Sequence, residues 1–141
     1  MIRPAQPGDM DAARKLFREY AEWVGREMVN LPGEYLPLLL AFDSDTLAGC
    51  AGLRKIGDGI GEMKRLYVRP AFQGRGYGRQ LLDRIIVEAK TAGYSLLRLD
   101  TLPVMERAIA LYLAVGFHEI PRYGDNPPDA ICFELALCHV Y

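Results

Sequence analysis

The sequence is poor in cysteine, because its 141 residues include only Cys50, Cys132 and Cys138. Their number is odd, and no pair has the spacing of a CxxC motif or of a mixed cysteine and histidine metal site. We therefore expect neither a disulfide framework nor a zinc or other metal site. Cysteine packs well as a small apolar side chain, so we interpret all three as residues in or near strands rather than as reactive thiols.

A surplus of charge is also missing, because the formal net charge is only −1 at pH 7. Nucleic-acid and membrane partners usually require a basic surplus, so we expect neither of them. No apolar run approaches the roughly 20 residues that span a bilayer, and the first residues lack the apolar core of a signal peptide. Linkers and repeats are absent from the sequence as well. We therefore expect one cytoplasmic domain over residues 1–141.

Apolar residues recur with helical spacing in three segments and form strand-like runs in five others. The expected helices cover residues 9–24 with Asp9 as the N-cap, 81–89 with Gly93 as the stop, and 105–115; the expected strands cover 38–42, 47–55, 62–68, 96–101 and 131–137. Residues 24–37 are expected to form a loop with room for one helical turn. A strand, helix and strand in succession after residue 62 predict a parallel pair with a right-handed crossover. The predicted fold is α/β, a mixed and mainly antiparallel sheet with helices on both faces.

A glycine-rich segment, residues 68–79, lies between an expected strand and an expected helix. Its glycines Gly74, Gly76 and Gly78 allow a tight turn, and they bring consecutive backbone N–H groups close to a ligand at the positive end of the helix. Such a loop favours an anion. The glycine spacing alone is equally compatible with a simple turn in front of a solvated basic helix face.

The charges around this segment favour the ligand. Six basic residues lie between positions 64 and 84, whereas Asp83 is the only acid in that stretch. A polyanionic ligand would match this asymmetry. A dinucleotide fingerprint is not matched, because Arg79 stands where the third glycine should be, although Asp100 keeps that alternative open as a ribose-binding acid. A Gly-Lys-Ser/Thr phosphate loop is absent.

The same loop resembles the acetyl-coenzyme A signature Gln/Arg-x-x-Gly-x-Gly/Ala of the GNAT superfamily of N-acetyltransferases, through Gln73, Gly76 and Gly78. The resemblance continues in residues 66–70 and 108–117. It implies a GNAT-like fold, with acetyl-CoA as cosubstrate between two splayed strands, one that ends at Val68 and the next, which begins at Leu96. The coenzyme-binding residues that it implies are Leu66, Tyr67, Val68, Gln73, Gly74, Arg75, Gly76, Tyr77, Gly78 and Arg79.

Acetyl transfer to an amine needs a polarised thioester carbonyl, a base for the amine and a proton for the departing thiolate. The resemblance assigns the carbonyl to the backbone N–H of Val68 and the acid to Tyr112, which otherwise would be a core tyrosine on an apolar helix face. Glu62 is the best-placed carboxylate for the base, because it begins the expected third strand. The alternatives are that Glu62 is a surface residue after a glycine turn and that a water chain takes the proton.

The acceptor is less well defined by the sequence. His118 and His139 lack nucleophile and carboxylate partners at a recognisable spacing, so we expect no catalytic triad. Trp23 is the aromatic residue of the first helix that we expect to reach an acceptor pocket, and residues 123–129 either fold over it or form a plain turn. The resemblance implies a primary amine on a small molecule or peptide as acceptor. A homodimer is compatible with it, and a non-catalytic sensor of acyl-coenzyme A is the alternative function.

Overall fold

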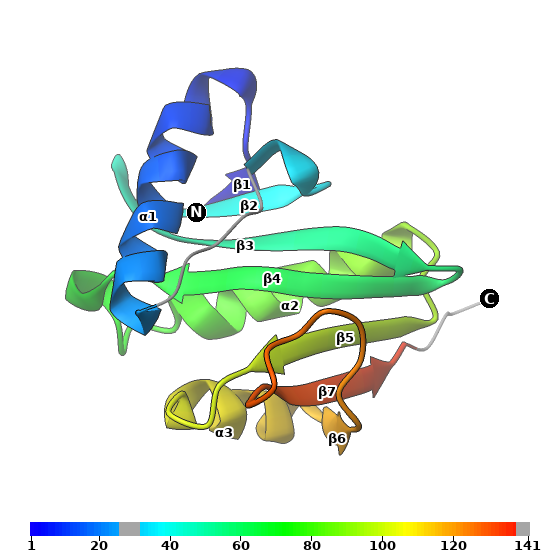
Figure 1. Ribbon diagram of the computed structural model, residues 1–141. Coiled ribbons are helices and arrows are strands. Elements are labelled where there is room, and N and C mark those ends of the chain that lie inside the picture. The colour runs from blue at the N-terminus through cyan, green and yellow to red at the C-terminus, as the bar shows by residue number, and fades with distance from the viewer. Residues whose placement is uncertain (26–31, 138–141) are drawn as a thin grey trace. The chain divides into compact units, whose positions relative to one another are not determined.

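The computed structural model describes residues 1–25 and 32–137, so Cys138 and His139 lie outside the described part. The chain divides into two compact units, one made of Met1–Arg54 and Met63–Glu88 and the other of Lys55–Glu62 and Ala89–Tyr141. Together they contain seven strands, paired mostly antiparallel, and helices (Figure 1). The mixed α/β fold predicted from the sequence is confirmed.

The strands of the first unit follow one another in the order β1-β2-β3-β4. They are β1 (Ile2–Pro4), β2 (Leu38–Asp43), β3 (Thr46–Gly57) and β4 (Ile60–Val68), the last two of which extend into the second unit. β1 and β3 both pair antiparallel with β2, and the register of the second pair shifts between Ala41 and Phe42. Sequence analysis missed β1 because three residues are too short to show an alternating pattern.

Two helices cover opposite faces of these strands, α1 (Met10–Val24) and α2 (Tyr77–Thr91) (Figure 1). Residues 38–41 of β2 are all buried, which means that both faces of the strand are covered. Leu38 and Leu40 share a core cluster with Leu16 and Phe17 of α1, so the intervening residues point to the other face. There α2 supplies buried leucines and an isoleucine, each of which stabilises the fold by about 1.5–3 kcal/mol on burial.

Asp9 stands at the N-cap position of α1, as predicted, but its carboxylate does not cap the helix. It accepts a 2.8 Å hydrogen bond from the backbone N–H of Gln6 and forms a 2.7 Å ion pair with Arg3. These two interactions lower the pKa of Asp9 from 3.8 to about 2. Asp9 therefore ties the start of α1 to β1 rather than to the first turn of its own helix.

The second unit contains β5 (Leu96–Thr101), α3 (Glu106–Val115), β6 (His118–Ile120) and β7 (Ile131–Ala136). Its strands follow the order β5-β7-β6, and both pairs are antiparallel. The predicted strand at 96–101 and the helix near 105–115 are confirmed. The short edge strand β6 was missed, for the same reason as β1, and His118 lies at its exposed start.

Several element boundaries differ from the sequence-based expectation, and α2 for example begins at Tyr77 rather than at residue 81. β4 begins at Ile60 rather than at residue 62, because the chain turns fully at Asp58 and Gly59 and Gly61 continues as strand. The expected helical turn in the 24–37 loop is a short 3-10 helix at Pro32–Glu34. Within residues 1–25 and 32–137, no helix is long and apolar enough to cross a membrane.

Candidate active site

The glycine-rich loop follows β4 and a short 3-10 helix at Pro70–Phe72, and it leads into α2. Gly74 and Gly76 have φ angles of +79° and +87°, a conformation that side-chain-bearing residues adopt only with strain. Nothing lies within 4 Å of a Cβ built on Gly74, and near Gly76 only the end of the Gln80 side chain comes to 3.8 Å. The loop therefore leaves open space beside its backbone. Gly78 differs, since it lies within the first turn of α2 and does not have a positive φ.

Helix α2 begins immediately after this turn, at Tyr77. The N–H of Gln80 bonds to the carbonyl of Gly76 at 3.1 Å, which closes the first turn of the helix. The amides of residues 77–79 therefore precede that first bond and have no acceptor inside the helix. They lie at the positive end of the helix dipole, so the backbone here fits the phosphates of a coenzyme.

Gln73, the first residue of the coenzyme signature, closes the loop onto the end of β4. Its Nε2 donates a 3.0 Å hydrogen bond to the carbonyl of Val68. The neighbouring N–H, that of Arg69, donates to the Ala48 carbonyl on β3 at 2.8 Å. Since successive backbone groups of a strand point to opposite sides, the N–H of Val68 is directed away from β3. Leu66 lies half-buried two residues earlier on the same strand.

Asp83 is the only acid between positions 64 and 84 in the sequence, but the structure brings two distant acids to the basic residues as well. The ion pairs are Arg69 with Glu19 and Arg75 with Asp43, and within α2 they are Arg79 with Asp83 and Arg84 with Glu88. Glu19 and Asp43 are more than 30 positions away from their partners in the sequence, so a local charge count could not include them. The positive charge at the loop is therefore smaller than the sequence predicted.

Asp43, at the end of β2, fixes two side chains of the loop at once. It accepts a 2.9 Å hydrogen bond from the hydroxyl of Tyr77 and forms a 3.2 Å ion pair with Arg75. The hydrogen bond to this carboxylate raises the pKa of Tyr77. The guanidinium of Arg75 also lies 5.4 Å from the ring centre of Phe72. Nothing in the sequence signalled that Asp43 belongs to this loop.

Tyr67 contributes its side chain to the packing of β4 against α1. Its ring is buried and stacks on Tyr20, with 5.4 Å between the ring centres. Burial raises the pKa of its phenol. Trp23, on the last turn of α1, tilts against the same ring at 6.4 Å and is 57% exposed. The indole is therefore exposed, and the expectation that Trp23 reaches an acceptor pocket stays a prediction.

Cys50 and Cys132, the two described cysteines, are both buried, as expected of packing residues. The Cys50 thiol lies 3.2 Å from the carbonyl of Arg65, and burial raises its pKa to about 12. A thiol with such a high pKa is a poor nucleophile at neutral pH. Within the described part of the chain, no three His, Cys, Asp or Glu side chains gather around a common point that could hold a metal ion.

In the second unit, Tyr112 lies on α3 and is 4% exposed. Its ring packs against Phe117 at 5.8 Å and against Phe133 at 6.1 Å between ring centres. The ring therefore belongs to the core of this unit, as the packing interpretation predicted. That burial fixes the direction of the phenol and is equally compatible with a catalytic hydroxyl.

Glu62 is the third residue of β4 and only 2% exposed, so its interpretation as a surface glutamate after a glycine turn is wrong. Its Oε2 accepts a 2.6 Å hydrogen bond from the hydroxyl of Tyr123, which lies in the loop between β6 and β7. The burial of Tyr123, and then the charges of Glu62 and Asp100, raise the pKa of this phenol far above its ordinary range. Sequence analysis named the 123–129 loop but not this contact, because 61 positions separate the two residues.

Comparison with known proteins agrees with these features. Residues 5–117 match the Acetyltransferase (GNAT) family. An uncharacterized N-acetyltransferase of Schizosaccharomyces pombe is 34% identical over 147 aligned positions, covering 93% of this chain and 90% of that protein. A [ribosomal protein bS18]-alanine N-acetyltransferase of Salmonella typhimurium is 37% identical over 116 positions, covering 82% of this chain and 77% of that protein.

A solved structure shows the same fold at lower identity. It is a Salmonella typhimurium protein determined with its cofactor acetyl-CoA, and it aligns with a TM-score of 0.78 and 22% identity over 99% of this chain and 95% of its own. The family match covers most of the chain, including the glycine-rich loop, Glu62 and Tyr112. The chain therefore belongs to the GNAT family of acetyltransferases and is an acetyl-CoA-dependent N-acetyltransferase, as the resemblance of its loop predicted.

Proposed function

We propose that the loop of residues 68–79 holds acetyl-CoA and that the enzyme acetylates the primary amine of a peptide or small molecule. The coenzyme assignment rests on Gly74 and Gly76, which have left-handed backbone conformations and lie directly before the first turn of α2. Their open backbone and the amides of residues 77–79 suit a pyrophosphate. We assign the backbone of Leu66 and the N–H of Val68, which is directed away from β3, to the pantetheine arm; the Val68 carbonyl already accepts from Gln73.

Three groups of this chain then have catalytic roles in our proposal. The thioester of acetyl-CoA supplies an acetyl group that is activated for attack by an amine. The Val68 N–H donates a hydrogen bond to the carbonyl oxygen on which negative charge develops. The Glu62 carboxylate accepts the proton of the amine, and the Tyr112 hydroxyl donates a proton or a hydrogen bond to the departing thiolate.

Peptide α-amines are the acceptor class that we would test first. The support comes from the Salmonella relative, which is named for the acetylation of an alanine of ribosomal protein bS18 and is 37% identical. The exposed Trp23 supports an acceptor site beside α1, since an aromatic face can hold an apolar or ammonium group. A small-molecule amine would need the same three catalytic groups.

Coenzyme binding tests the assignment of the loop to acetyl-CoA, and turnover with different amines tests the acceptor class. Acetyl-CoA should raise the melting temperature, because a ligand that binds only the native state stabilises it. A peptide with an N-terminal alanine and the polyamine spermidine, each tested for thiol release, would then identify the acceptor class. Binding without thiol release from any amine would instead support the acyl-coenzyme A sensor. A larger thermal shift with NAD than with acetyl-CoA would contradict the loop assignment.

Three further expectations complete the proposal. Both units act as one N-acetyltransferase domain over residues 1–141, supported by the family match, which spans residues of both. A single cooperative unfolding transition would test this. A cytoplasmic location is supported by Cys50 and Cys132, which form no disulfide in the described part of the chain, and cell fractionation would test it. A homodimer stays a prediction, and light scattering would decide it.

A further inference from the structure

A short side-chain hydrogen bond in the second unit joins Tyr123 to Glu62. The phenol lies 2.6 Å from Oε2 of the carboxylate, and the carboxylate itself is 98% buried. An ionised carboxylate loses much of its hydration at such a position. Each hydrogen-bond donor that contacts it therefore replaces part of that hydration and helps to fix the orientation of the carboxylate. Tyr123 reaches it from a loop, whereas most buried groups are satisfied by their own sheet or helix.

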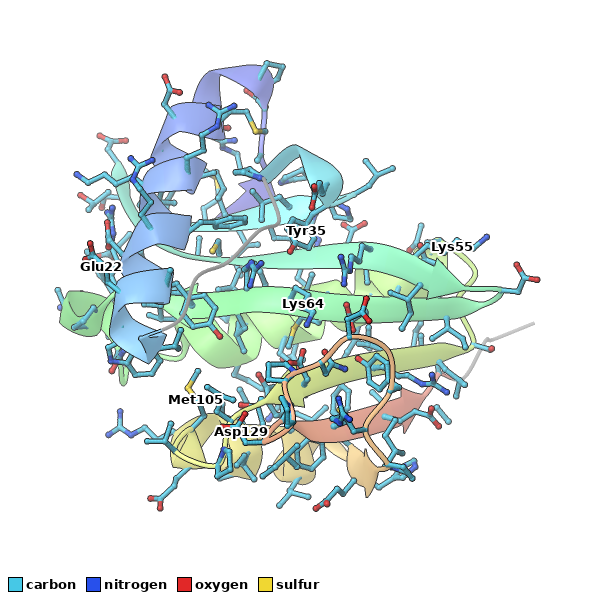
Figure 2. All side chains as sticks on the ribbon, viewed as in Figure 1. Glu22, Tyr35, Lys55, Lys64, Met105 and Asp129 are labelled. Atoms are coloured by element: carbon cyan, nitrogen blue, oxygen red, sulfur yellow. The ribbon has the colours of Figure 1, made fainter. Side chains whose placement is uncertain are left out.

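That loop, residues 121–130, is built to hold Tyr123 in place. Asn126 is only 7% exposed, and its side-chain amide donates a 2.8 Å hydrogen bond back to the carbonyl of Tyr123. The same amide lies 3.6 Å from the sulfur of Cys132 on β7, and Arg122 donates a 2.8 Å bond to the Asn126 carbonyl. Figure 2 shows the loop in orange, with Asp129 labelled near its end. A plain turn would not need a buried amide at its centre.

The ring of Tyr123 is held from the sheet as well. The guanidinium of Arg98, on β5, lies 5.2 Å from the ring centre. Arg98 is in turn fixed by a 2.8 Å ion pair with Glu134, its cross-strand partner on β7. Tyr123 is therefore held at its backbone by Asn126 and at its ring by Arg98, while its hydroxyl contacts Glu62.

The phenol is a permanent donor in this setting. The groups that act on its titration are Glu62 on β4, Asp100 on β5 and Cys132 on β7, and together with burial they raise its pKa. Tyr123 consequently keeps its proton at any pH at which the enzyme is folded and active. It can donate to the carboxylate but cannot compete with it for the proton of an amine.

We propose that Tyr123 is the positioning residue of the catalytic base: its hydroxyl holds the Glu62 carboxylate in one orientation. The inference rests on the proposed role of Glu62. In the reaction, the amine proton moves to Glu62, while the Tyr123 proton stays on the phenol oxygen throughout. The 121–130 loop thereby sets the geometry of the base, in addition to any contact that it makes with an acceptor.

Tyr123→Phe tests the proposal, because it keeps the ring over which Arg98 lies and removes only the hydroxyl. With a peptide carrying an N-terminal alanine, or with water as the acceptor, thiol release should slow by about tenfold to a hundredfold at saturating acetyl-CoA. The KM for acetyl-CoA should not change.

Tyr77→Phe is the matched control, because it also removes a hydroxyl bonded to a carboxylate, that of Asp43 in the coenzyme loop. It should raise the KM for acetyl-CoA. Carbon-13 spectra of the protein with labelled glutamate side chains give a readout that needs no turnover. The Glu62 resonance, assigned by its loss in Glu62→Gln, should shift in Tyr123→Phe and not in Tyr77→Phe.

A double-mutant cycle separates this inference from the proposed function. If Tyr123 acts through Glu62, then Tyr123→Phe should have little further effect in a Glu62→Gln background. Slow thiol release by Glu62→Gln together with a normal rate in Tyr123→Phe would overturn the positioning role and leave the proposed base in place. If the double variant is slower than either single variant by the product of their two effects, the residues act independently, and the positioning role would be overturned as well. Full activity of Glu62→Gln would show that Glu62 is not the base, and the positioning role of Tyr123 would be overturned with it. The assignment of the glycine-rich loop to acetyl-CoA would still be tested separately, by coenzyme binding.

Discussion

The hydroxyl of Tyr77 donates a hydrogen bond to the Asp43 carboxylate, 34 positions earlier in the chain. This contact joins the turn after β2 to the first residue of α2, so a carboxylate lies beside a loop that we assign to phosphate binding. A carboxylate repels phosphate, but here it is neutralised by Arg75 on its other oxygen. The loop therefore gains a fixed geometry at little electrostatic cost, and its backbone rather than its side-chain charge is expected to dominate coenzyme affinity.

The first prediction concerns the backbone of the loop. Gly76→Val should abolish acetyl-CoA binding, because the φ of +87° disfavours valine and the branched side chain fills the space open to phosphate. Calorimetry with acetyl-CoA is the measurement. Gly93→Val is the control, since Gly93 has nearly the same φ, +86°, and nothing within 4 Å of a Cβ, but lies after α2. Equal loss of acetyl-CoA binding in both variants would show that backbone strain, rather than the position of Gly76 beside the phosphates, causes the loss.

The second prediction concerns the side-chain charges of the coenzyme loop. Changing both Arg75 and Arg79 to Gln should weaken coenzyme binding only modestly, by about threefold to tenfold, because both guanidinium groups are half exposed and already paired with acids. The remaining affinity should depend less on salt, since screening acts mainly on exposed charges. Titrations at low and high ionic strength would measure the slope. A hundredfold loss of affinity would show that the side chains, not the backbone, hold the coenzyme.

The third prediction distinguishes the two interpretations of Tyr112. Tyr112→Phe keeps the ring that packs on Phe117 and Phe133 and removes only the hydroxyl. If the phenol acts on the departing thiolate, the rate constant of transfer should fall by about tenfold to a thousandfold. Coenzyme affinity and melting temperature should hardly change. A variant with full turnover and a lower melting temperature would show instead that the hydroxyl is structural.

The fourth prediction concerns the pH dependence of stability. The ion pair with Arg3 and the Gln6 amide lower the pKa of Asp9 to about 2, below its ordinary 3.8. A depressed carboxyl pKa stabilises the folded state above the unfolded-state value, and this contribution is lost as the pH falls from about 4 toward 2. Asp9→Asn should therefore reduce the pH dependence of the unfolding free energy in that interval, measured by urea unfolding.

Asp11→Asn is the control for this experiment. The Asp11 side chain is fully exposed, and its ion pair with Arg14 lies within one turn of α1. Exposed pairs of this kind contribute little to stability. The curve of unfolding free energy against pH should therefore match that of the unmodified protein, and equal effects of the two substitutions would point to net charge rather than to the Asp9 contacts.

Local patterns were enough to predict much of the fold and the coenzyme loop. The strand at Leu96–Thr101 and the helix ending before Gly116 follow from apolar periodicity, which depends on neighbours within a few positions. The turn at Gly74 and Gly76 could be read in the same way, since the need for glycine is a property of the backbone at that point. The short strands Ile2–Pro4 and His118–Ile120 could not, because only their partners make them strands.

The amino-acid sequence by itself determined the family, the coenzyme signature and the candidate acid and base, because each rests on residues close together in the chain. Only the tertiary structure decided the surroundings of those residues. It buried Glu62, brought Tyr123 to it across 61 positions and set Asp43 beside Tyr77 across 34. Burial and hydrogen bonding depend on which distant segments meet, and the chemistry of a carboxylate or phenol depends on both.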